Sequence, residues 1–473
     1  MIDRVRGYTS FLIRSAFLTA KGAVVARIKY SQAFWQRLAE LEQSQWLSSS
    51  ELRELQNRKL RALVAHVYEH VPYYRRLFDQ RGLKPRDVET AEDLKKLPLL
   101  TKDLLRANAH DLVARGVAGQ VALPGWTTGS TGSPINAVRT REAIVFENAM
   151  IWRQRRLAGV QPGDTKAVVW GTIWGNVIIP SSRRHLPPYW RWNLAERQLL
   201  FSYYHMTDET LHRYFDRMEK SGVVCIEGFP STMLVLAQHL RRHNRTVPLK
   251  AIFTSSEPLY RIHRDLIEER FQTKVFDLYG QAERVVAATE CERHDGLHLN
   301  QEYGITEVLK EGGECRDNEV GEIVGTGLNN YAMPLIRYCT GDLARLSHEP
   351  CGCGRQMGRL SAVEGRLADL IHTLDGRTVP GNGIMGAFHG IGNLRRTQVV
   401  QNEPSTVHVK IVKAYPDQGV DLESLKKNLQ ACLGAGMTVY CEFVSDSDLE
   451  SGPKYRWVVS RIGQEHGPPV VDC

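Results

Sequence analysis

The chain has 473 residues, of which 42% are hydrophobic and 24% are charged, the composition of an ordinary globular protein with room for two or three domains. Its formal net charge of +8 is spread out, without the concentrated Lys and Arg runs that would favour nucleic acid. The charge fits an anionic small molecule or weak attraction to acidic lipid. Nine cysteines, an odd and mostly scattered set, argue against a disulfide framework.

Two features set the expected location. The apolar stretch 17–25 is interrupted by Lys21 and has no convincing cleavage site, so no signal peptide is expected. No run of about 18 apolar residues occurs, so no transmembrane helix is expected. The sequence therefore predicts a cytoplasmic protein.

The first 50 residues mix basic and apolar side chains in a helical pattern. Two interpretations are open: a helix packed on the main body, or an amphipathic segment resting on a membrane surface. A second helix is predicted over 50–70, where apolar side chains repeat every 3.6 residues behind three serines at 48–50. Further helix starts follow Pro72 and Thr90, which predicts a helical lead-in over 1–110.

Residues 127–134 read Thr-Thr-Gly-Ser-Thr-Gly-Ser-Pro. Glycines let the backbone turn tightly with several N–H groups on one side, and the hydroxyls add donors, so this loop can wrap a phosphate. Apolar segments on both sides predict a strand–loop–strand hairpin. The loop lacks the Gly-Lys-Ser/Thr ending of a Walker motif, and taken alone such a loop is more often a plain surface turn.

Between residues 141 and 280, strand and helix patterns alternate, which is typical of a parallel sheet with helices on its faces. In such sheets ligands bind at the carboxyl ends of strands. Three predicted strands end there in polar or glycine-containing segments, 228–230, 255–257 and 280–283. The predicted strands are 167–170, 223–226, 251–256 and 275–280, and the predicted helices are 141–158, 207–221, 231–243 and 261–271.

The pattern then changes twice. Residues 297–365 show shorter strands and turns, which predicts a small β subdomain at the end of an N-terminal domain of 1–365. Beyond Gly365-Arg366, strand-like segments at 397–412 and 438–444 flank a helix at 422–433. Residues 366–473 are therefore predicted to form a small, mobile α+β domain, and the fold class is α/β.

Several motifs, taken in order, resemble the adenylate-forming (acyl-/aryl-CoA ligase) superfamily. The closest resemblance is to the phenylacetate–CoA ligase group, and within it to the CapK-like branch linked to capsular polysaccharide. The resemblance covers nearly the whole chain and is carried by spacing and order. The motifs are Val-Pro-Tyr-Tyr at 71–74, the loop 127–134, Gly-Phe-Pro-Ser at 228–231, Thr-Ser-Ser-Glu-Pro-Leu at 254–259, Tyr-Gly-Gln-Ala-Glu at 279–283, Tyr-Cys-Thr-Gly-Asp at 338–342, Gly365-Arg366 and Ser-Gly-Pro-Lys-Tyr-Arg at 451–456.

The resemblance implies that a carboxylate attacks the α-phosphorus of ATP to give acyl-AMP and pyrophosphate, and that the acyl group then passes to an acceptor, usually CoA. This chemistry needs a pyrophosphate cradle, Mg²⁺, a nucleoside clamp and a cation at the α-phosphate. The cradle would be Thr127, Thr128, Gly129, Ser130, Thr131 and Gly132.

The resemblance also assigns roles to single residues. Glu283 would ligate Mg²⁺; the alternative is a solvated loop glutamate. Asp342 would accept both ribose hydroxyls, a task suited to a carboxylate, although aspartate is also common in turns. The remaining nucleotide-binding candidates are Tyr279, Gly280 and Gln281 at the adenine, Ser256, Glu257 and Pro258 along the other side, and Arg366 at the ribose and phosphate.

Lys454 is the candidate catalytic lysine, because an ammonium can neutralise charge that develops at the α-phosphate. It lies far along the chain from the phosphate loop, so the small domain must swing onto the large one, with 366–369 as the hinge. Two residues depart from the family pattern: Ser133 holds the place of a loop lysine, and Pro453 is inserted before Lys454. Lys454 can also be an ordinary surface lysine.

A structural Zn²⁺ site is predicted from Cys291, His298, Cys351 and Cys353, with His294 as the substitute for His298. Cysteine and histidine form tetrahedral zinc sites, but one residue between Cys351 and Cys353 is not the usual spacing. Related ligases carry similar sets. The alternative is a group of free thiols.

Three functions remain open from the sequence. The first is ATP-dependent adenylation of a small carboxylic acid with transfer to CoA. The second is CapK-like transfer to an amine or hydroxyl in polysaccharide or metabolite biosynthesis. The third is a catalytically degenerate nucleotide-binding scaffold, which Ser133 and Pro453 keep open. No nucleic acid is expected as a partner, and membrane contact through the basic N-terminus is open.

Overall fold

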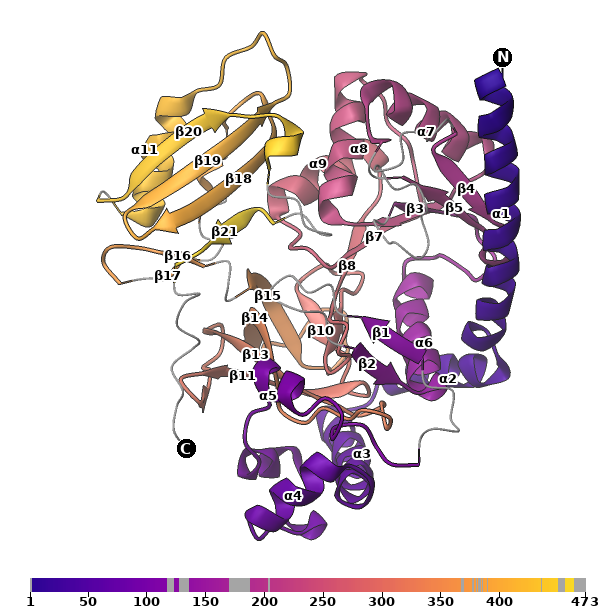
Figure 1. Ribbon diagram of the computed structural model, residues 1–473, viewed down its shortest axis with the longest axis vertical. Helices are drawn as coiled ribbons and strands as arrows, with labels where there is room; N and C mark the ends of the chain where they lie inside the picture. The colour runs from indigo at the N-terminus through magenta and orange to yellow at the C-terminus, as the bar shows by residue number, and fades with distance from the viewer. Residues whose placement is uncertain are drawn as a thin grey trace.

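The computed structural model describes residues 2–116, 123–126, 136–169, 188–202, 205–366, 370–376, 378–379, 381, 384, 386–388, 390–434, 436–449 and 456–462. Figure 1 shows a large body around one long sheet, with helices of the N-terminal region along one edge and beneath it. A smaller C-terminal sheet lies beside the body at the upper left of the view. The α/β fold class predicted from the sequence is confirmed.

The N-terminal region is helical, as predicted. Helix α3 begins with a capping box, in which Ser48 accepts from the Glu51 N–H while the Glu51 carboxylate accepts from the Ser48 N–H. At the predicted helix start after Thr90, the Asp93 carboxylate accepts from the Thr90 N–H at 2.9 Å, but the segment is a 3-10 helix. The elements are α1 (Ile2–Lys29), α2 (Gln32–Ser44), α3 (Ser49–His70), α4 (Pro72–Gln80), η1 (Pro85–Asp87), η2 (Ala91–Lys96) and α5 (Lys102–Ala107).

The predicted alternation of strands and helices forms the parallel part of the large sheet. Its strands run in the order β8, β7, β6, β3, β5, with β4 antiparallel at the outer edge. Strand β6 lies two residues later than predicted, because Cys225 to Gly228 rather than Val223 pair with both neighbours. The strands are β3 (Lys166–Val169), β4 (Trp190–Asn193), β5 (Gln198–Phe201), β6 (Cys225–Gly228), β7 (Ala251–Ser255) and β8 (Val275–Gly280), and the helices are α6 (Arg141–Leu157), α7 (Asp208–Lys220), α8 (Pro230–Arg242) and α9 (Arg261–Phe271), with the short turn η4 (Leu194–Glu196).

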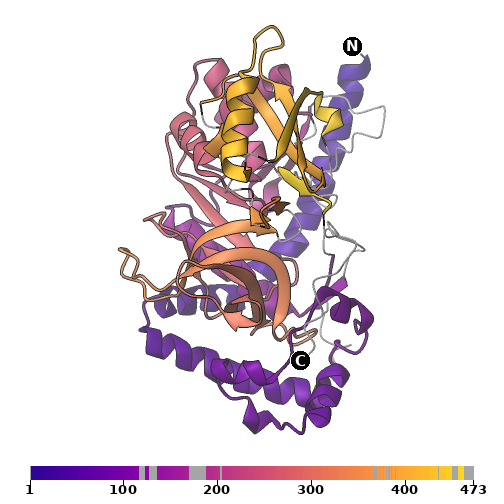
Figure 2. The ribbon, with the colours of Figure 1, turned by 90° about the vertical axis from the view of Figure 1, so that its left-hand side faces the viewer.

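An antiparallel part continues the same sheet beyond β8, in the order β9, β10, β15, β14, β13, β11, β12. Figure 2 shows the long strands of this part bending strongly. Register shifts within the β13–β14 and β14–β15 pairs fit that curvature, because bulges increase local bending. The strands are β9 (Ala287–Thr289), β10 (Leu297–Leu299), β11 (Gly304–Lys310), β12 (Gly313–Glu314), β13 (Val320–Gly327), β14 (Tyr338–Ser347) and β15 (Arg359–Arg366).

The C-terminal part has its own four-stranded sheet and its own core. The strand order is β20-β19-β18-β21, and Leu425, Leu429 and Leu433 of α11 are buried against it. Contacts with the body include Trp457 against Tyr260, with ring centroids 5.1 Å apart. The elements are β16 (Ile371–His372), β17 (Thr378–Val379), η7 (Gly386–Phe388), β18 (Leu394–Glu403), β19 (Thr406–Lys413), α11 (Leu422–Leu433), β20 (Thr438–Phe443), η8 (Asp446–Asp448) and β21 (Val458–Ser460).

Within the described residues, no helix combines the length and the apolar character needed to cross a membrane. The division of the chain at residue 365 stays a prediction.

Candidate functional site

The carboxyl ends of β6, β7 and β8 lie side by side, because these strands are parallel neighbours in close register. The segments that follow them bring Phe229–Ser231, Ser256–Glu257 and Gly280–Glu283 to one edge of the sheet. The Glu257 carboxylate accepts from the Ser231 N–H at 3.1 Å, which ties two of these ends together. Ser256 has a φ of 74°, a left-handed conformation that turns the chain sharply after β7.

Glu283 follows β8 and is held by a residue that the sequence did not single out. The buried Tyr338 donates its hydroxyl to Glu283 Oε1 at 2.7 Å. Burial, with the Glu283 charge beside it, raises the pKa of Tyr338, so the phenol stays protonated and keeps donating. This hydrogen bond engages only Oε1 of the two Glu283 carboxylate oxygens.

Asp342 is brought together with two other predicted nucleotide-binding residues. Tyr279 donates to Asp342 Oδ2 at 2.9 Å, and Arg366 Nε lies 3.6 Å from Asp342 Oδ1. Arg366 faces Asp342 across the β14–β15 pair. Burial raises the pKa of Asp342, and the Arg366 guanidinium opposes that shift. We call Tyr279, Glu283, Tyr338, Asp342 and Arg366 the nucleotide corner.

The nucleotide corner depends on the curvature of the sheet. Three strands separate β8 from β14 in the sheet order, yet side chains from the two ends of that stretch are in hydrogen-bond contact. The sheet must therefore curl over that stretch, which agrees with the bent strands of Figure 2. Sequence patterns show that the strands end in polar residues, but they do not show that the sheet curls far enough to bring β8 and β14 into contact.

The hairpin predicted around the glycine loop forms, with β1 (Leu123–Trp126) antiparallel to β2 (Asn136–Arg139). Arg139 at the end of β2 donates to the Ala282 carbonyl at 2.6 Å, directly before Glu283. The hairpin that carries the loop is therefore fixed beside the Glu283 segment.

Some predicted residues lie outside the described part of the chain. These are Thr127 to Gly132 with Ser133, the lysine at 454, the proline at 453, and positions 367–369 of the hinge. Their assigned roles stay predictions.

Lys102 is a second residue that the sequence analysis missed. Hydrogen bonds of the Leu100 N–H to the Arg337 carbonyl (2.9 Å) and of the Cys339 N–H to the Leu100 carbonyl (3.0 Å) fix the start of α5 on β14. Lys102 Nζ then lies next to Gly341, only 2.8 Å from where a Cβ would stand. The positive charge of Lys102 lowers the pKa of Asp342, against the rise that burial causes. No spacing in the sequence distinguishes Lys102 from other lysines at helix starts.

The four predicted zinc ligands converge. One ligand atom from each of Cys291, His298, Cys351 and Cys353 lies within 4.8 Å of all the others. Antiparallel pairing of β10 with both β9 and β15 brings the two loops together. His294, the predicted substitute, is not part of this group, and its ring contacts Glu290 instead. We call the four residues the cysteine cluster.

The geometry of the cysteine cluster fits a tetrahedral ion. Cys291 Sγ lies 3.8 Å from Cys351 Sγ, and Cys353 Sγ lies 3.4 Å from His298 Nε2. Zn–S bonds of about 2.3 Å in a tetrahedron place two sulfurs about 3.8 Å apart. Burial lowers the pKa of His298 to about 4, so its imidazole is neutral and can donate a lone pair.

Backbone N–H groups also point at the sulfurs of the cluster. The Arg293 N–H donates to Cys291 Sγ at 3.4 Å, and the Arg355 N–H donates to Cys353 Sγ at 3.5 Å. Such bonds stabilise thiolates that coordinate a metal. The residues present therefore fit the predicted structural Zn²⁺.

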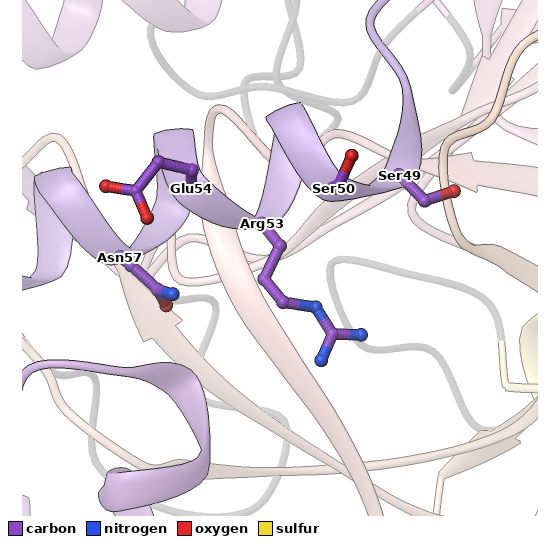
Figure 3. A pocket seen from close by; sticks show the side chains of 5 residues that line it. All are labelled: Ser49, Ser50, Arg53, Glu54 and Asn57. Carbon is purple, nitrogen blue, oxygen red and sulfur yellow. The ribbon is translucent and has the colours of Figure 1, made fainter.

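A surface hollow of about 340 Å³ lies along the first turns of α3. Figure 3 shows the side chains that line it. Its polar groups already have structural partners. Arg53 pairs with Glu92 at 2.8 Å, and Asn57 accepts from the Ala91 N–H at 3.0 Å. None of its lining residues was predicted to bind a ligand, and it is separate from the nucleotide corner.

Comparisons with known proteins agree with this architecture. Residues 371–461 match the family model of the CapK C-terminal domain. Protein CapK of Staphylococcus aureus is 22% identical over 472 residues, covering 98% of this chain and 100% of that protein. The phenylacetate-coenzyme A ligase of Escherichia coli is 29% identical over 341 residues, covering 70% of this chain and 75% of the ligase.

A solved structure shows the same fold. The crystal structure of 2-hydroxyisobutyryl-CoA ligase in its postadenylation state superposes with a TM-score of 0.69 at 22% identity, covering 88% of this chain and 90% of the other. The fold and its homologues thus define the class as that of adenylate-forming ligases, as the motifs predicted. Within this class the chain is similar to CapK over its full length and to the phenylacetate–CoA ligases over about 70% of it, and residues 371–461 match the CapK type of C-terminal domain.

Proposed function

We propose that the chain activates a small carboxylic acid with ATP, giving acyl-AMP and pyrophosphate, and then passes the acyl group to CoA. The nucleotide corner carries this proposal. It sets a buried carboxylate for the ribose, Asp342, beside a second carboxylate for a cation, Glu283, at the carboxyl ends of the sheet strands.

Each residue of the nucleotide corner has a physical task in this reaction. Asp342 accepts the ribose hydroxyls, while Tyr279 and Arg366 hold its carboxylate in place. Tyr338 orients Glu283, which would hold Mg²⁺. The ion, when bound, would offset negative charge on the phosphates. The glycine loop 127–132, whose hairpin ends beside Ala282, would wrap the leaving pyrophosphate.

The two parts of the chain would work in turn. We propose that the body, residues 1–365, binds ATP and the acid, and that residues 366–473 bring Lys454 to the α-phosphate. A rotation at 366–369 would then admit the acceptor. This proposal is supported by the separate sheet and core of the C-terminal part.

The cysteine cluster would bind Zn²⁺ as a structural ion. All four positions are filled by protein ligands, which is typical of structural rather than catalytic zinc. The ion would fasten the loop after β9 to the loop between β14 and β15.

A second candidate acceptor is an amine or hydroxyl, in CapK-like polysaccharide or metabolite biosynthesis. The match of residues 371–461 to the CapK C-terminal domain favours it. The third candidate, a degenerate scaffold, would follow if Ser133 and Pro453 abolish adenylation. The cytoplasmic location stays a prediction.

Exchange of labelled pyrophosphate into ATP tests the proposal. A panel of aliphatic, aromatic and hydroxylated acids is screened with Mg²⁺, and AMP release is then measured with CoA, amines or sugars as acceptors. Exchange that depends on one class of acid, and is lost in Asp342→Ala, is the expected result. Tight ATP binding without exchange for any acid would favour the scaffold. If AMP release requires an amine or a sugar, that compound rather than CoA is the acceptor.

A further inference from the structure

Helix α1 closes the open edge of the large sheet. It runs along the outer margin of the body beside β4 (Figure 1). The Trp192 N–H donates to Ser15 Oγ and the Leu194 N–H donates to Thr19 Oγ1, each at 3.1 Å. Hydroxyls of α1 thus accept from backbone N–H groups at the sheet edge, which would otherwise be open to pairing with another strand.

The inner face of α1 packs closely. Leu18 is buried with Val168 and Leu200. A Cβ at Gly22 would stand 2.2 Å from Asn193 Oδ1, so the glycine permits the close approach of the helix to β4. Positions 15, 18 and 22 therefore mark the side of α1 that faces the protein.

The opposite face of α1 is also apolar, and it is exposed. Ile13, Phe17 and Val24 are 65%, 66% and 61% exposed, and Leu12 beside them is 60% exposed. Positions 13, 17 and 24 lie on one stripe of a helix, opposite 15, 18 and 22. Leu194, next to α1 at the edge of the sheet, is 63% exposed and extends the patch. When both faces of a helix are apolar, both are ordinarily buried against protein or another apolar surface.

The charges on α1 indicate what covers the outer face. The helix sequence contains six basic residues and one acidic residue, Asp3. The basic residues are Arg4, Arg6, Arg14, Lys21, Arg27 and Lys29. A second copy of the chain would bring two such helices, and their like charges, together. A surface of anionic lipid complements both the apolar stripe and the basic residues.

We propose that α1 docks the protein on an anionic lipid surface, lying flat with Ile13, Phe17 and Val24 at the boundary of headgroups and acyl chains. The helix keeps its inner face on β4 while bound. The large sheet would then lie edge-on beside the lipid, fixed through the hydrogen bonds of Ser15 and Thr19.

Sedimentation with vesicles tests the proposal on the full-length protein. Vesicles of phosphatidylcholine alone are compared with vesicles containing about one third phosphatidylglycerol. We expect partitioning only to the anionic vesicles, with weaker binding at high salt. Replacing Ile13→Glu together with Phe17→Glu should lower the partition coefficient at least about tenfold. Phe443→Glu, at an exposed apolar residue of β20, is the matched control and should bind like the parent protein.

Thermal melting and pyrophosphate exchange of both variants show whether the fold is intact, because neither substitution touches the nucleotide corner. Equal binding of the parent protein to neutral and anionic vesicles, or to neither, would overturn the proposal. So would unchanged binding of the double variant. Sedimentation velocity without lipid adds a further check. A dimer of the parent protein that dissociates in the double variant would show that a second copy of the chain, and not lipid, covers the outer face of α1.

Discussion

The nucleotide corner and the cysteine cluster are both assembled from residues far apart in the chain, but they differ in chemistry. In the corner, carboxylates are held by tyrosine hydroxyls and a guanidinium. In the cluster, each of the four side chains points a ligand atom at a common centre, and backbone N–H groups support the sulfurs. In the proposed function the corner must receive a ligand and release it, whereas the cluster would hold its ion permanently.

This difference predicts which measurements respond to mutation. Damage to the cluster should change stability first and activity only as a consequence. Damage to the corner should change ligand binding or catalysis while the fold remains stable. The following variants test that contrast.

The largest effect is expected from Cys351→Ser. Losing one ligand should release the ion and leave buried polar groups without their partner, lowering the free energy of unfolding by more than about 4 kcal/mol. Elemental analysis should find one zinc per chain in the parent protein and none in the variant. Thermal melting of both proteins measures the loss of stability.

Cys225→Ser is the matched control, because Cys225 is a buried thiol in β6 outside the cluster. It should retain the zinc. A parent protein purified without zinc, with the same melting temperature before and after treatment with a chelator, would show that the cluster is only a set of free thiols.

Asp342→Ala should weaken ATP binding by about 2–4 kcal/mol, because two charge-assisted hydrogen bonds to the ribose are lost. Calorimetric titration with ATP measures the effect, and the zinc content should stay the same. Because burial raises the pKa of Asp342, ATP affinity in the parent protein should begin to fall at a higher pH than for an ordinary aspartate as the solution is acidified. An unchanged affinity in the variant would make Asp342 a turn residue only.

Lys454→Ala should slow adenylation by roughly 2–4 kcal/mol of activation free energy, as expected for one lost transition-state donor. It should spare acyl transfer from pre-formed acyl-AMP. Ala368→Pro, which restricts the proposed hinge, should do the reverse or hold one orientation. Single-turnover assays of the two half-reactions separate these outcomes. If Lys454→Ala affects both steps equally, or neither, Pro453 has displaced the lysine.

The smallest effect is expected from Tyr338→Phe. It removes the hydrogen bond to Glu283 but keeps the ring, so we expect a loss of about 1 kcal/mol in adenylation with a higher Mg²⁺ requirement. Mg²⁺ titration of pyrophosphate exchange measures it. Tyr74→Phe is a control, because within the described part of the chain the Tyr74 hydroxyl bonds the backbone groups of Pro334 and Ile336 and no side chain. An equal loss in both variants would indicate general destabilisation.

Much of the local structure could be predicted from the sequence. Helices α9 and α11 and strand β8 have the bounds that the periodicity predicted, and the serine cap of α3 forms as a capping box. These elements depend on interactions within a few residues, such as capping and one buried stripe, which local sequence records directly. The shift of β6 by two residues shows the limit, because neighbouring strands set its register.

The candidate residues divide in the same way. Tyr279, Asp342 and Arg366 were found because each lies in a short motif of recognisable order. Tyr338 lies in the same motif as Asp342 but was given no role, and Lys102 was missed, because their contacts are made across the curled sheet and at the start of α5. Among the cysteine cluster candidates, the sequence favoured His298 with His294 as the substitute, and the tertiary structure brings the His298 ring to the sulfurs through the pairing of β10.

By itself, the sequence determined the class of the chain, the alternation of strands and helices, and most of the residues with the chemistry for nucleotide and metal binding. The tertiary structure decided which of those residues meet, because three strands of a curving sheet lie between Tyr279 and Asp342 and no local pattern encodes that closure. It also decided that α1 has two apolar faces with different surroundings, one against β4 and one exposed. A helical pattern records that both faces are apolar, but only packing shows which of them the protein itself covers.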